Sequence, residues 1–160
     1  MKGKFWLIIL IGLVLFLFWS ISFSRIEKAE TIKKFDDSQL VEVKRVIDGD
    51  TIEVKINGKN EMVRLIGIDA PEMTDSSMKG KLALESKNKL EEILKNKKIK
   101  LESDFGQSDR DVYNRLLRYV FLEDGTLVNK KMIEEGLAEE YTFKTPYKYQ
   151  EEFRKIGIVK

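Results

Sequence analysis

Cysteine and histidine are both absent from the 160-residue sequence, and each absence removes a class of site. Without cysteine, the chain can form no disulfide framework, no catalytic thiol and no cysteine-based zinc site. Without histidine, a transition-metal site is disfavoured, because imidazole is a usual ligand of these metals. Any metal that this chain binds is therefore expected to be a hard cation held by oxygen atoms.

The balance of charge excludes a second class of protein. The chain has 29 Lys and Arg residues against 27 Asp and Glu residues. Two of the lysines lie within the first 24 residues, which contain no acid, so the remainder carries 27 residues of each sign. A protein that coats nucleic acid through many phosphate contacts is expected to be clearly cationic. If this chain handles a polyanion, it must do so at one local site.

Residues 1–24 are predicted to form a membrane anchor or signal helix, because residues 5–24 are uncharged and follow Lys2 and Lys4. As a helix, the 19 residues from Phe5 to Phe23 would span roughly 28 Å, close to the ~30 Å hydrocarbon core of a bilayer. An anchor is favoured over a cleaved signal because the apolar run is long and residues 22–24 make a poor cleavage site. The lysines are expected to stay inside. This predicts a single-pass protein of the cell membrane with its domain outside the cell or, after cleavage, a secreted protein.

Residues 39–160 are predicted to form one α+β domain that is mainly β, after a charged linker at residues 25–38. Apolar and polar residues alternate in strand fashion, and Asn57-Gly58 is a two-residue hairpin signal. Five short strands with a helix after the third fit a closed five-stranded OB-fold barrel with about three helices. The expected elements are strands at 39–47, 51–56, 61–69, 98–103 and 115–123, helices at 78–96 and 127–135, and a short last helix after Tyr149.

The turn Asp48-Gly49-Asp50, which separates the first two predicted strands, is the first candidate site. Its simplest interpretation is a bend, since glycine permits φ > 0 and short acids bond their own backbone. An EF-hand loop counted from Asp48 would need an oxygen ligand where Ile52 stands and glycine where Glu53 stands, so that alternative fails. Taken alone, the turn predicts structure rather than chemistry.

The stretch VRLIGIDAPE, residues 63–72, puts a charge in an unexpected place. By strand alternation, Arg64 shares a face with Ile66 and Ile68. A guanidinium among apolar neighbours needs an anionic partner or a functional role. The alternative is an edge strand whose arginine reaches water.

The end of the same stretch can aim oxygen atoms at a ligand. Asp69 ends the predicted strand, and Pro71 forces a turn after it. Ala70 precedes the proline, so its extended geometry can leave its carbonyl free to face a ligand. Glu72 then projects from a rigid turn.

A third cluster, residues 111–121 (DVYNRLLRYVF), puts Arg115 directly after Asn114, a residue that tolerates left-handed geometry.

Together, the motifs IDGDT, RLIGIDAPE, YNR and GLA resemble the staphylococcal nuclease (thermonuclease) family in order and spacing, over about Val41 to Tyr149. The resemblance implies the five-stranded OB barrel with helices. It also implies a calcium-dependent endonuclease that hydrolyses phosphodiester bonds in DNA, RNA or both.

By position, the resemblance implies a role for each member of the site. The calcium ligands are expected to be Asp50, Asp69 and the main-chain carbonyl of Ala70, and the general base is expected to be Glu72. Two arginines are expected to grip the reacting phosphate, namely Arg64 and Arg115. A second phosphate is expected at Tyr113, and the base at Tyr141 and Phe143, which align only loosely across a one-residue gap.

The sequence also departs from the family pattern. Ala70 stands where the family often has Thr, and Asn114 where it often has Gly. Glu139 and Glu140 add negative charge near the expected substrate end, and the last helix is short. None of these differences removes a catalytic residue.

The chemistry that the resemblance implies is physically reasonable for this set of residues. Calcium held by carboxylates can orient a phosphate, and two arginines offer paired donors whose contacts strengthen as charge builds in the transition state. A carboxylate near a bound water can take its proton, so histidine is not required.

The expected partners are a nucleic acid substrate and, through the N-terminal helix, a membrane, and the chain is expected to be a monomer. The alternative is a non-catalytic OB-fold module that binds nucleic acid or a protein partner, since fold does not decide function.

Overall fold

The computed structural model describes residues 16, 39–72 and 78–158. The chain divides into two units, Met1–Asp36 and Asp37–Lys160, and the second contains every described residue except Phe16. Within the described ranges, no helix combines the length and the apolar character that a bilayer crossing requires. The predicted membrane helix and the predicted linker lie outside the described residues, again except for Phe16.

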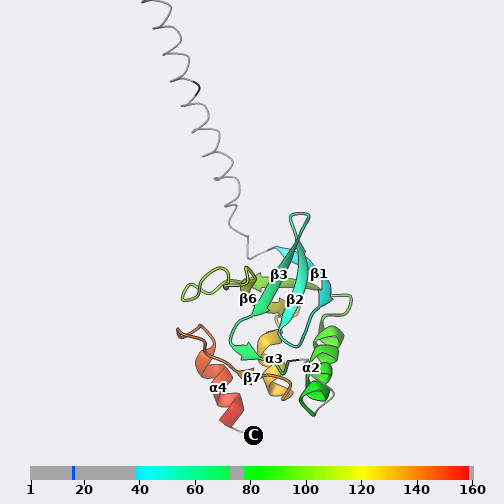
Figure 1. The fold of residues 1–160 in the computed structure, drawn as a ribbon, viewed down its shortest axis with the longest axis vertical. Helices are drawn as coiled ribbons and strands as arrows, with labels where there is room; N and C mark the ends of the chain where they lie inside the picture. The colour runs from blue at the N-terminus through cyan, green and yellow to red at the C-terminus, as the bar shows by residue number, and fades with distance from the viewer. Residues whose placement is uncertain (1–15, 17–38, 73–77, 159–160) are drawn as a thin grey trace, which may run out of the picture. The chain divides into compact units, whose positions relative to one another are not determined.

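Five strands of the second unit close into a barrel, as the sequence predicts (Figure 1). Around the barrel the strands follow the order β1-β2-β3-β6-β5, in which β3 and β6 run parallel and all other neighbours run antiparallel. This is the OB-type arrangement in which a closed sheet leaves no free edge. The five strands are β1 (Leu40–Val46), β2 (Thr51–Ile56), β3 (Lys59–Leu65), β5 (Lys98–Glu102) and β6 (Leu116–Leu122).

The barrel core follows from the alternation of side chains along each strand. In β2, Ile52 and Val54 are completely buried, whereas Lys55 faces solvent. The turn between β2 and β3 consists of Asn57 (φ 50°) and Gly58 (φ 81°). Positive φ at both positions is the geometry that a two-residue hairpin favours, so the hairpin prediction is confirmed.

The prediction of one continuous strand over residues 61–69 is wrong. β3 ends at Leu65, and a turn at Gly67 (φ 80°) leads into a separate short strand, β4 (Ile68–Asp69). A side chain at Gly67 would also collide with the ring of Tyr147, because its Cβ would lie 2.6 Å from Cε2. β4 pairs with β7 (Glu139–Glu140), which the sequence did not predict.

Three helices accompany the barrel, α2 (Met78–Leu94), α3 (Val128–Glu134) and α4 (Gln150–Ile158), and they lie below it in Figure 1. The predicted stop at Gly136 is confirmed: its φ is 75°, its N–H donates to the carbonyl of Ile133, and the N–H of Leu137 donates to Met132. This pair of bonds is the Schellman arrangement. The buried face of α2 comprises Ala83, Ser86, Leu90, Ile93 and Leu94.

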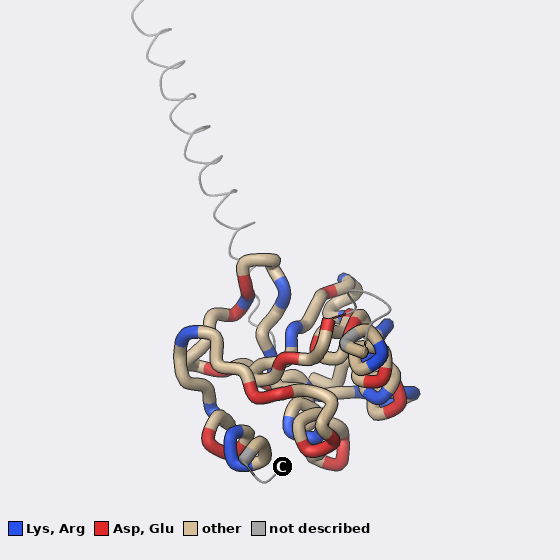
Figure 2. The backbone as a smooth tube through the Cα atoms, turned by 60° about the horizontal axis from the view of Figure 1, so that its bottom comes forward, with Lys and Arg blue, Asp and Glu red and all other residues tan. Residues whose placement is uncertain are grey.

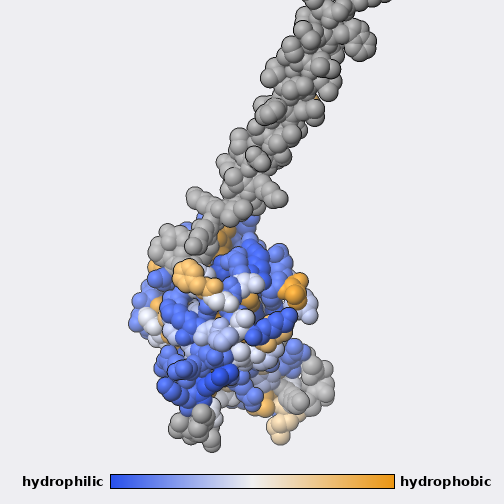
Figure 3. All heavy atoms as spheres, turned by 90° about the vertical axis from the view of Figure 1, so that its left-hand side faces the viewer, coloured by the Kyte–Doolittle hydropathy of each residue, from blue (hydrophilic) through white to orange (hydrophobic). Residues whose placement is uncertain are grey.

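The described surface shows no extended stripe of one charge. Lys and Arg positions are interspersed with Asp and Glu positions along helices, strands and loops (Figure 2). The face shown in Figure 3 is largely hydrophilic, with small separate apolar patches. The mixture of both charge signs in Figure 2 agrees with the near-neutral charge balance of the sequence.

Candidate functional site

The turn between β1 and β2 is held by its own acid and by close packing. The Asp48 carboxylate accepts a hydrogen bond from the N–H of Asp50 at 3.0 Å, so the turn-forming role of Asp48 is confirmed. Gly49 does not adopt positive φ, which corrects the reason expected for that glycine. A Cβ at position 49 would lie 2.0 Å from Oγ of Ser86 and 2.6 Å from Cβ of Ala70. Gly49 is therefore needed because α2 and the β4 segment approach it closely.

This turn places Asp50 inside the protein, with only 6% of the residue exposed. Its Oδ2 accepts the N–H of Ala70 at 2.9 Å, and its Oδ1 accepts the hydroxyl of Thr51 at 2.9 Å. Burial raises the pKa of Asp50 to about 6, although the neighbouring Arg64 acts in the opposite direction. A carboxylate that has lost so much hydration is stabilised in its ionised form by a nearby cation.

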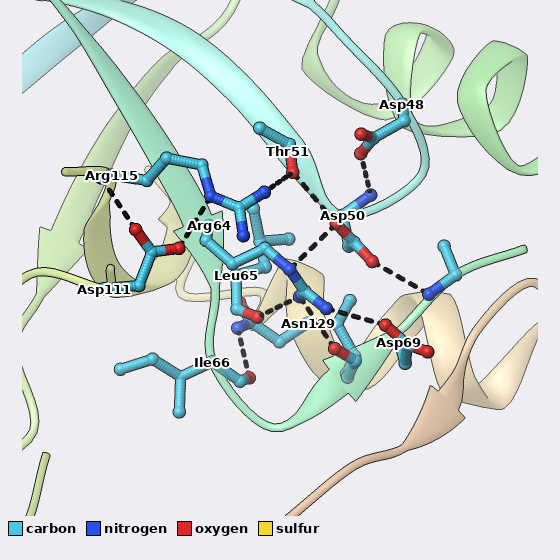
Figure 4. A network of polar contacts seen from close by, with 12 residues as sticks. Asp48, Asp50, Thr51, Arg64, Leu65, Ile66, Asp69, Asp111, Arg115 and Asn129 are labelled. Carbon is cyan, nitrogen blue, oxygen red and sulfur yellow. Dashed lines mark hydrogen bonds and ion pairs between the residues drawn. The ribbon is translucent and has the colours of Figure 1, made fainter. Parts of the chain in front are cut away.

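Arg64 joins this aspartate to the second predicted acid (Figure 4). Its Nε lies 3.1 Å from Asp50, and its Nη2 lies 2.8 Å from Asp69. Its Nη1 donates to the carbonyls of Leu65 (2.8 Å) and Ile68 (2.7 Å). The expectation of anionic partners for Arg64 is confirmed, whereas the edge-strand alternative is wrong because β3 has neighbours on both sides.

A buried asparagine fixes the turn that carries Asp69. The side-chain amide of Asn129 donates to the carbonyl of Ile66 at 2.9 Å, and its Oδ1 accepts the N–H of Val120 at 2.9 Å. On the other side of the turn, the N–H of Tyr141 donates to the carbonyl of Gly67. Asn129 was not among the predicted site residues, although a polar residue on the apolar face of α3 was a usable signal.

Arg115 reaches the same network from the loop before β6. Its Nε lies 2.7 Å from Oδ2 of Asp111, and its Nη1 lies 3.4 Å from Oγ1 of Thr51. Asn114 adopts φ 66°, which confirms the predicted left-handed position. Although burial opposes ionisation, hydrogen bonds from Arg115 hold the pKa of Asp111 below its usual value. Neither Asp111 nor Thr51 was among the predicted site residues. For Asp111, the available signal was an acid four residues before Arg115.

The remaining predicted residues lie at the margin of this network. Tyr113 is exposed, and its ring centroid lies 5.4 Å from Cζ of Arg115. Tyr141 and Phe143 are exposed after β7, with ring centroids 6.4 Å apart. Glu72 is exposed, and no hydrogen bond or ion pair joins it to another residue in the described ranges. The structure therefore brings together Asp50, Asp69, Ala70, Arg64 and Arg115, with Tyr113 beside Arg115. Within the described ranges, no side-chain hydrogen bond or ion pair joins Glu72, Tyr141 or Phe143 to them.

β7 adds a further acid next to the site. Asp69 and Glu139 are directly opposite each other in the β4–β7 pair, and both are exposed. Opposite residues of an antiparallel pair share a face. Glu139 thus adds negative charge beside Asp69, as the sequence suggests.

The donor atoms of the site fit calcium in part. Asp50 and Asp69 both lie within ion-pair distance of one cationic group, the guanidinium of Arg64. Across the described ranges, no group of three or more acidic side chains is arranged to hold a metal ion. Two carboxylates of this kind suit a hard cation whose other ligands are main-chain carbonyls, water or substrate oxygens.

Fold and site together define a class: a small closed barrel that carries a network of acids and arginines beside its β1–β2 turn. Comparison with known proteins agrees with this class. Residues 62–157 match the family described as Staphylococcal nuclease homologue.

Individual relatives extend the match beyond that range. The chain is 40% identical to the thermonuclease of Staphylococcus hyicus over 119 residues, which cover 72% of this chain and 67% of the relative. It is 37% identical to endonuclease YncB of Bacillus subtilis (strain 168) over 132 residues, or 80% of this chain and 62% of the relative. It is 41% identical to the thermonuclease of Staphylococcus intermedius over 112 residues, which cover 68% of this chain and 63% of the relative. The chain thus spans about two thirds of the length of these relatives, and it belongs to the staphylococcal nuclease family.

Proposed function

We propose that this chain is a calcium-dependent nuclease that hydrolyses phosphodiester bonds in DNA, RNA or both. Family membership and relatives named thermonuclease and endonuclease support this class of reaction. The observation that carries the proposal is the continuous network in which Asp50, Asp69, Arg64 and Arg115 converge (Figure 4).

Hydrolysis of a phosphodiester brings a nucleophile to an anionic centre and builds charge on the equatorial oxygens. We assign the calcium ligands to Asp50, Asp69 and the carbonyl of Ala70. Calcium bound there would supply positive charge that orients the phosphate and acts as a Lewis acid.

The side chains of the protein supply the other functions. The guanidinium groups of Arg64 and Arg115 donate to phosphate oxygens, and these charge-assisted bonds strengthen as negative charge grows. Glu72, whose exposed carboxylate is free of ion pairs within the described ranges, accepts a proton from the attacking water. Tyr113 is assigned to a second phosphate, and Tyr141 and Phe143 to stacking on a base, because base–aromatic stacking needs exposed rings.

The location of the activity is part of the same proposal. The uncharged residues 5–24 follow two lysines, which supports an N-terminal membrane anchor and a domain outside the cytoplasm. Cleavage after this segment would release a secreted enzyme. In either form we expect a monomer.

One experiment separates this function from a non-catalytic binding module. The protein is incubated with single-stranded DNA and, separately, with RNA, in calcium or in excess chelator, and the products are sized by electrophoresis. We expect fragments only in calcium. Retarded but intact nucleic acid in calcium would favour the binding module, and equal fragmentation in excess chelator would contradict the metal assignment.

A further inference from the structure

We propose that Asp111 is a positioning residue for Arg115, which fixes the guanidinium so that its terminal nitrogens face the acid cluster. This inference rests on the proposed function. It concerns a side chain for which the resemblance implies no role. In this inference, the Asp111 carboxylate determines the position of the Arg115 guanidinium.

The two oxygens of Asp111 have separate partners. Oδ2 accepts Nε–H of Arg115 at 2.7 Å. Oδ1 accepts the backbone N–H groups of Tyr113 and Arg115, both at 2.9 Å. One carboxylate therefore fixes the loop backbone at Tyr113 and Arg115 and also fixes the Arg115 side chain.

Besides Asp111, the Arg115 guanidinium has the exposed ring of Tyr113 beside it, with 5.4 Å between Cζ and the ring centroid. The N–H of Asp111 donates to the carbonyl of Arg115 at 3.0 Å, and the N–H of Asn114 donates to the carbonyl of Asp111 at 3.1 Å. Between them, Val112 and Tyr113 are 90% and 78% exposed, whereas the Asp111 side chain is only 17% exposed. The half-buried Asp111 thus holds an exposed stretch of the loop, together with Arg110, which donates to the carbonyl of Asn114 at 2.8 Å.

Holding Arg115 by Nε leaves its terminal nitrogens for the substrate. Nη1 lies 3.4 Å from the hydroxyl of Thr51, which itself donates to Asp50, and Nη2 has no hydrogen-bond or ion-pair partner among the described residues. Arg64 differs, because Asp50, Asp69 and two carbonyls engage all three of its nitrogens. Of the two arginines, Arg115 is therefore the one with a terminal nitrogen that has no hydrogen-bond or ion-pair partner within the described ranges.

A fixed guanidinium is expected to affect the rate more than substrate binding. A free arginine side chain samples many rotamers, and this freedom is lost when the side chain is fixed on a ligand. If Asp111 has already ordered the side chain, the full strength of the contact is available in the transition state, and small misplacements are costly. A purely structural Asp111 would instead change stability and leave the rate of the folded enzyme unchanged.

The substitution Asp111→Asn separates these two roles. An asparagine can keep an oxygen towards the two backbone N–H groups, but its amide nitrogen then faces Nε–H and cannot accept from it. Asp109→Asn is the matched control, because Asp109 lies in the same loop and pairs with a different arginine, Arg118, at 2.6 Å.

The activity test is a double-mutant cycle on the full chain with single-stranded DNA in saturating calcium. We expect Asp111→Asn to lower kcat about 10-fold with KM changed less than about 3-fold, and Asp109→Asn to change kcat less than about 2-fold. In the Arg115→Lys background, Asp111→Asn should have less than about a 2-fold effect, because the group that it positions is gone. An equal loss in both backgrounds, a loss in KM alone or no loss at all would overturn the inference.

A second measurement does not depend on catalysis. The relaxation of the Arg115 Nε–H signal by ¹⁵N NMR reports whether the side chain is ordered. We expect an ordered Nε–H in the parent and in Asp109→Asn, and a mobile one in Asp111→Asn. An equally ordered signal in Asp111→Asn would overturn the inference even if the parent cleaved no nucleic acid, and that absence of cleavage would contradict only the proposed function.

Discussion

At the scale of single residues, Arg64 and Arg115 contribute geometry as well as charge. Lysine keeps the charge but offers a compact ammonium in place of the planar fork. We predict that Arg64→Lys or Arg115→Lys lowers kcat roughly 100-fold or more. Arg64→Lys should also reduce stability, because the carbonyls of Leu65 and Ile68 lose a shared donor.

The matched control for these variants is Arg45→Lys. Arg45 is exposed and pairs with Glu53 at 2.9 Å, away from the network. Its activity on single-stranded DNA should stay within about 2-fold of the parent, since exposed ion pairs contribute little. Near-parental activity in either Arg64→Lys or Arg115→Lys would contradict the assignment of these residues to phosphate binding.

Gly49 offers a residue-scale test of how the acid turn is packed. In Gly49→Ala the new methyl group would meet Oγ of Ser86 at 2.0 Å, so the turn or α2 must shift. We predict a loss of about 1–3 kcal/mol in the free energy of unfolding, measured by urea denaturation. Gly157→Ala is the control: it lies in α4 with nothing within 4 Å of its added Cβ, and its stability should stay within about 1 kcal/mol of the parent. Similar stabilities for the two variants would contradict this packing account.

Most residues of the site were predictable, because four motifs resemble a known family in order and spacing. The acids at positions 50 and 69 and the arginines at 64 and 115 were all expected, and the structure brings them together. Asn129 and Thr51 could not be assigned in the same way, because their roles depend on contacts with other elements. Gly49 was expected for its backbone freedom, but a packing contact 37 residues away along the chain, with Ser86, is what requires it.

At the scale of elements, the barrel strands could be predicted and the β4–β7 pair could not. Each barrel strand has five to seven residues, enough for apolar alternation to be visible. β4 and β7 have two residues each and are defined by their mutual pairing. The prediction of one continuous strand at 61–69 was wrong because the backbone turns at Gly67. The alternation of apolar and polar residues gives no sign of such a turn.

An element-scale prediction concerns the segment that leads into α4. Asp104, in the loop after β5, accepts hydrogen bonds from the hydroxyl of Tyr119 (2.5 Å) and from the N–H groups of Lys148 (2.8 Å) and Gly106 (2.7 Å). Burial opposes ionisation of this carboxyl, but the hydrogen bonds outweigh it and hold the pKa of Asp104 below its usual value. The ionised form is therefore the one that the folded state stabilises.

The sign of the pH dependence follows from that lowered pKa. The unfolded state binds the proton more readily than the folded state. The stability that Asp104 contributes is therefore complete above its unfolded pKa of about 4 and is lost as the pH falls through its folded-state pKa. We predict that the parent is more stable than Asp104→Asn at pH 7 and that the difference shrinks below pH ~4. Denaturation of both proteins between pH 2.5 and 7 measures this. A difference that is constant over the whole range, or that grows in acid, would contradict it.

At the scale of the whole molecule, barrel closure is what assembles the site. Asp50 comes from the β1–β2 turn, Arg64 from β3, Asp69 from β4 and Arg115 from the loop before β6. The parallel β3–β6 pair sets Arg64 opposite Leu117, two residues after Arg115. A molecule with 27 residues of each charge after its first 24 residues can thus present one concentrated site without a cationic surface.

The calcium dependence of cleavage tests whether Asp50 and Asp69 hold calcium beside the two arginines. The initial rate on single-stranded DNA is measured against free calcium for the parent, Asp50→Ala, and the control Asp48→Asn, which keeps an oxygen for the turn. We predict no cleavage by the parent in excess chelator. The half-activating calcium concentration should rise about 10-fold or more in Asp50→Ala and change little in Asp48→Asn. Superimposed curves for the parent and Asp50→Ala, or full activity of the parent in chelator, would contradict it.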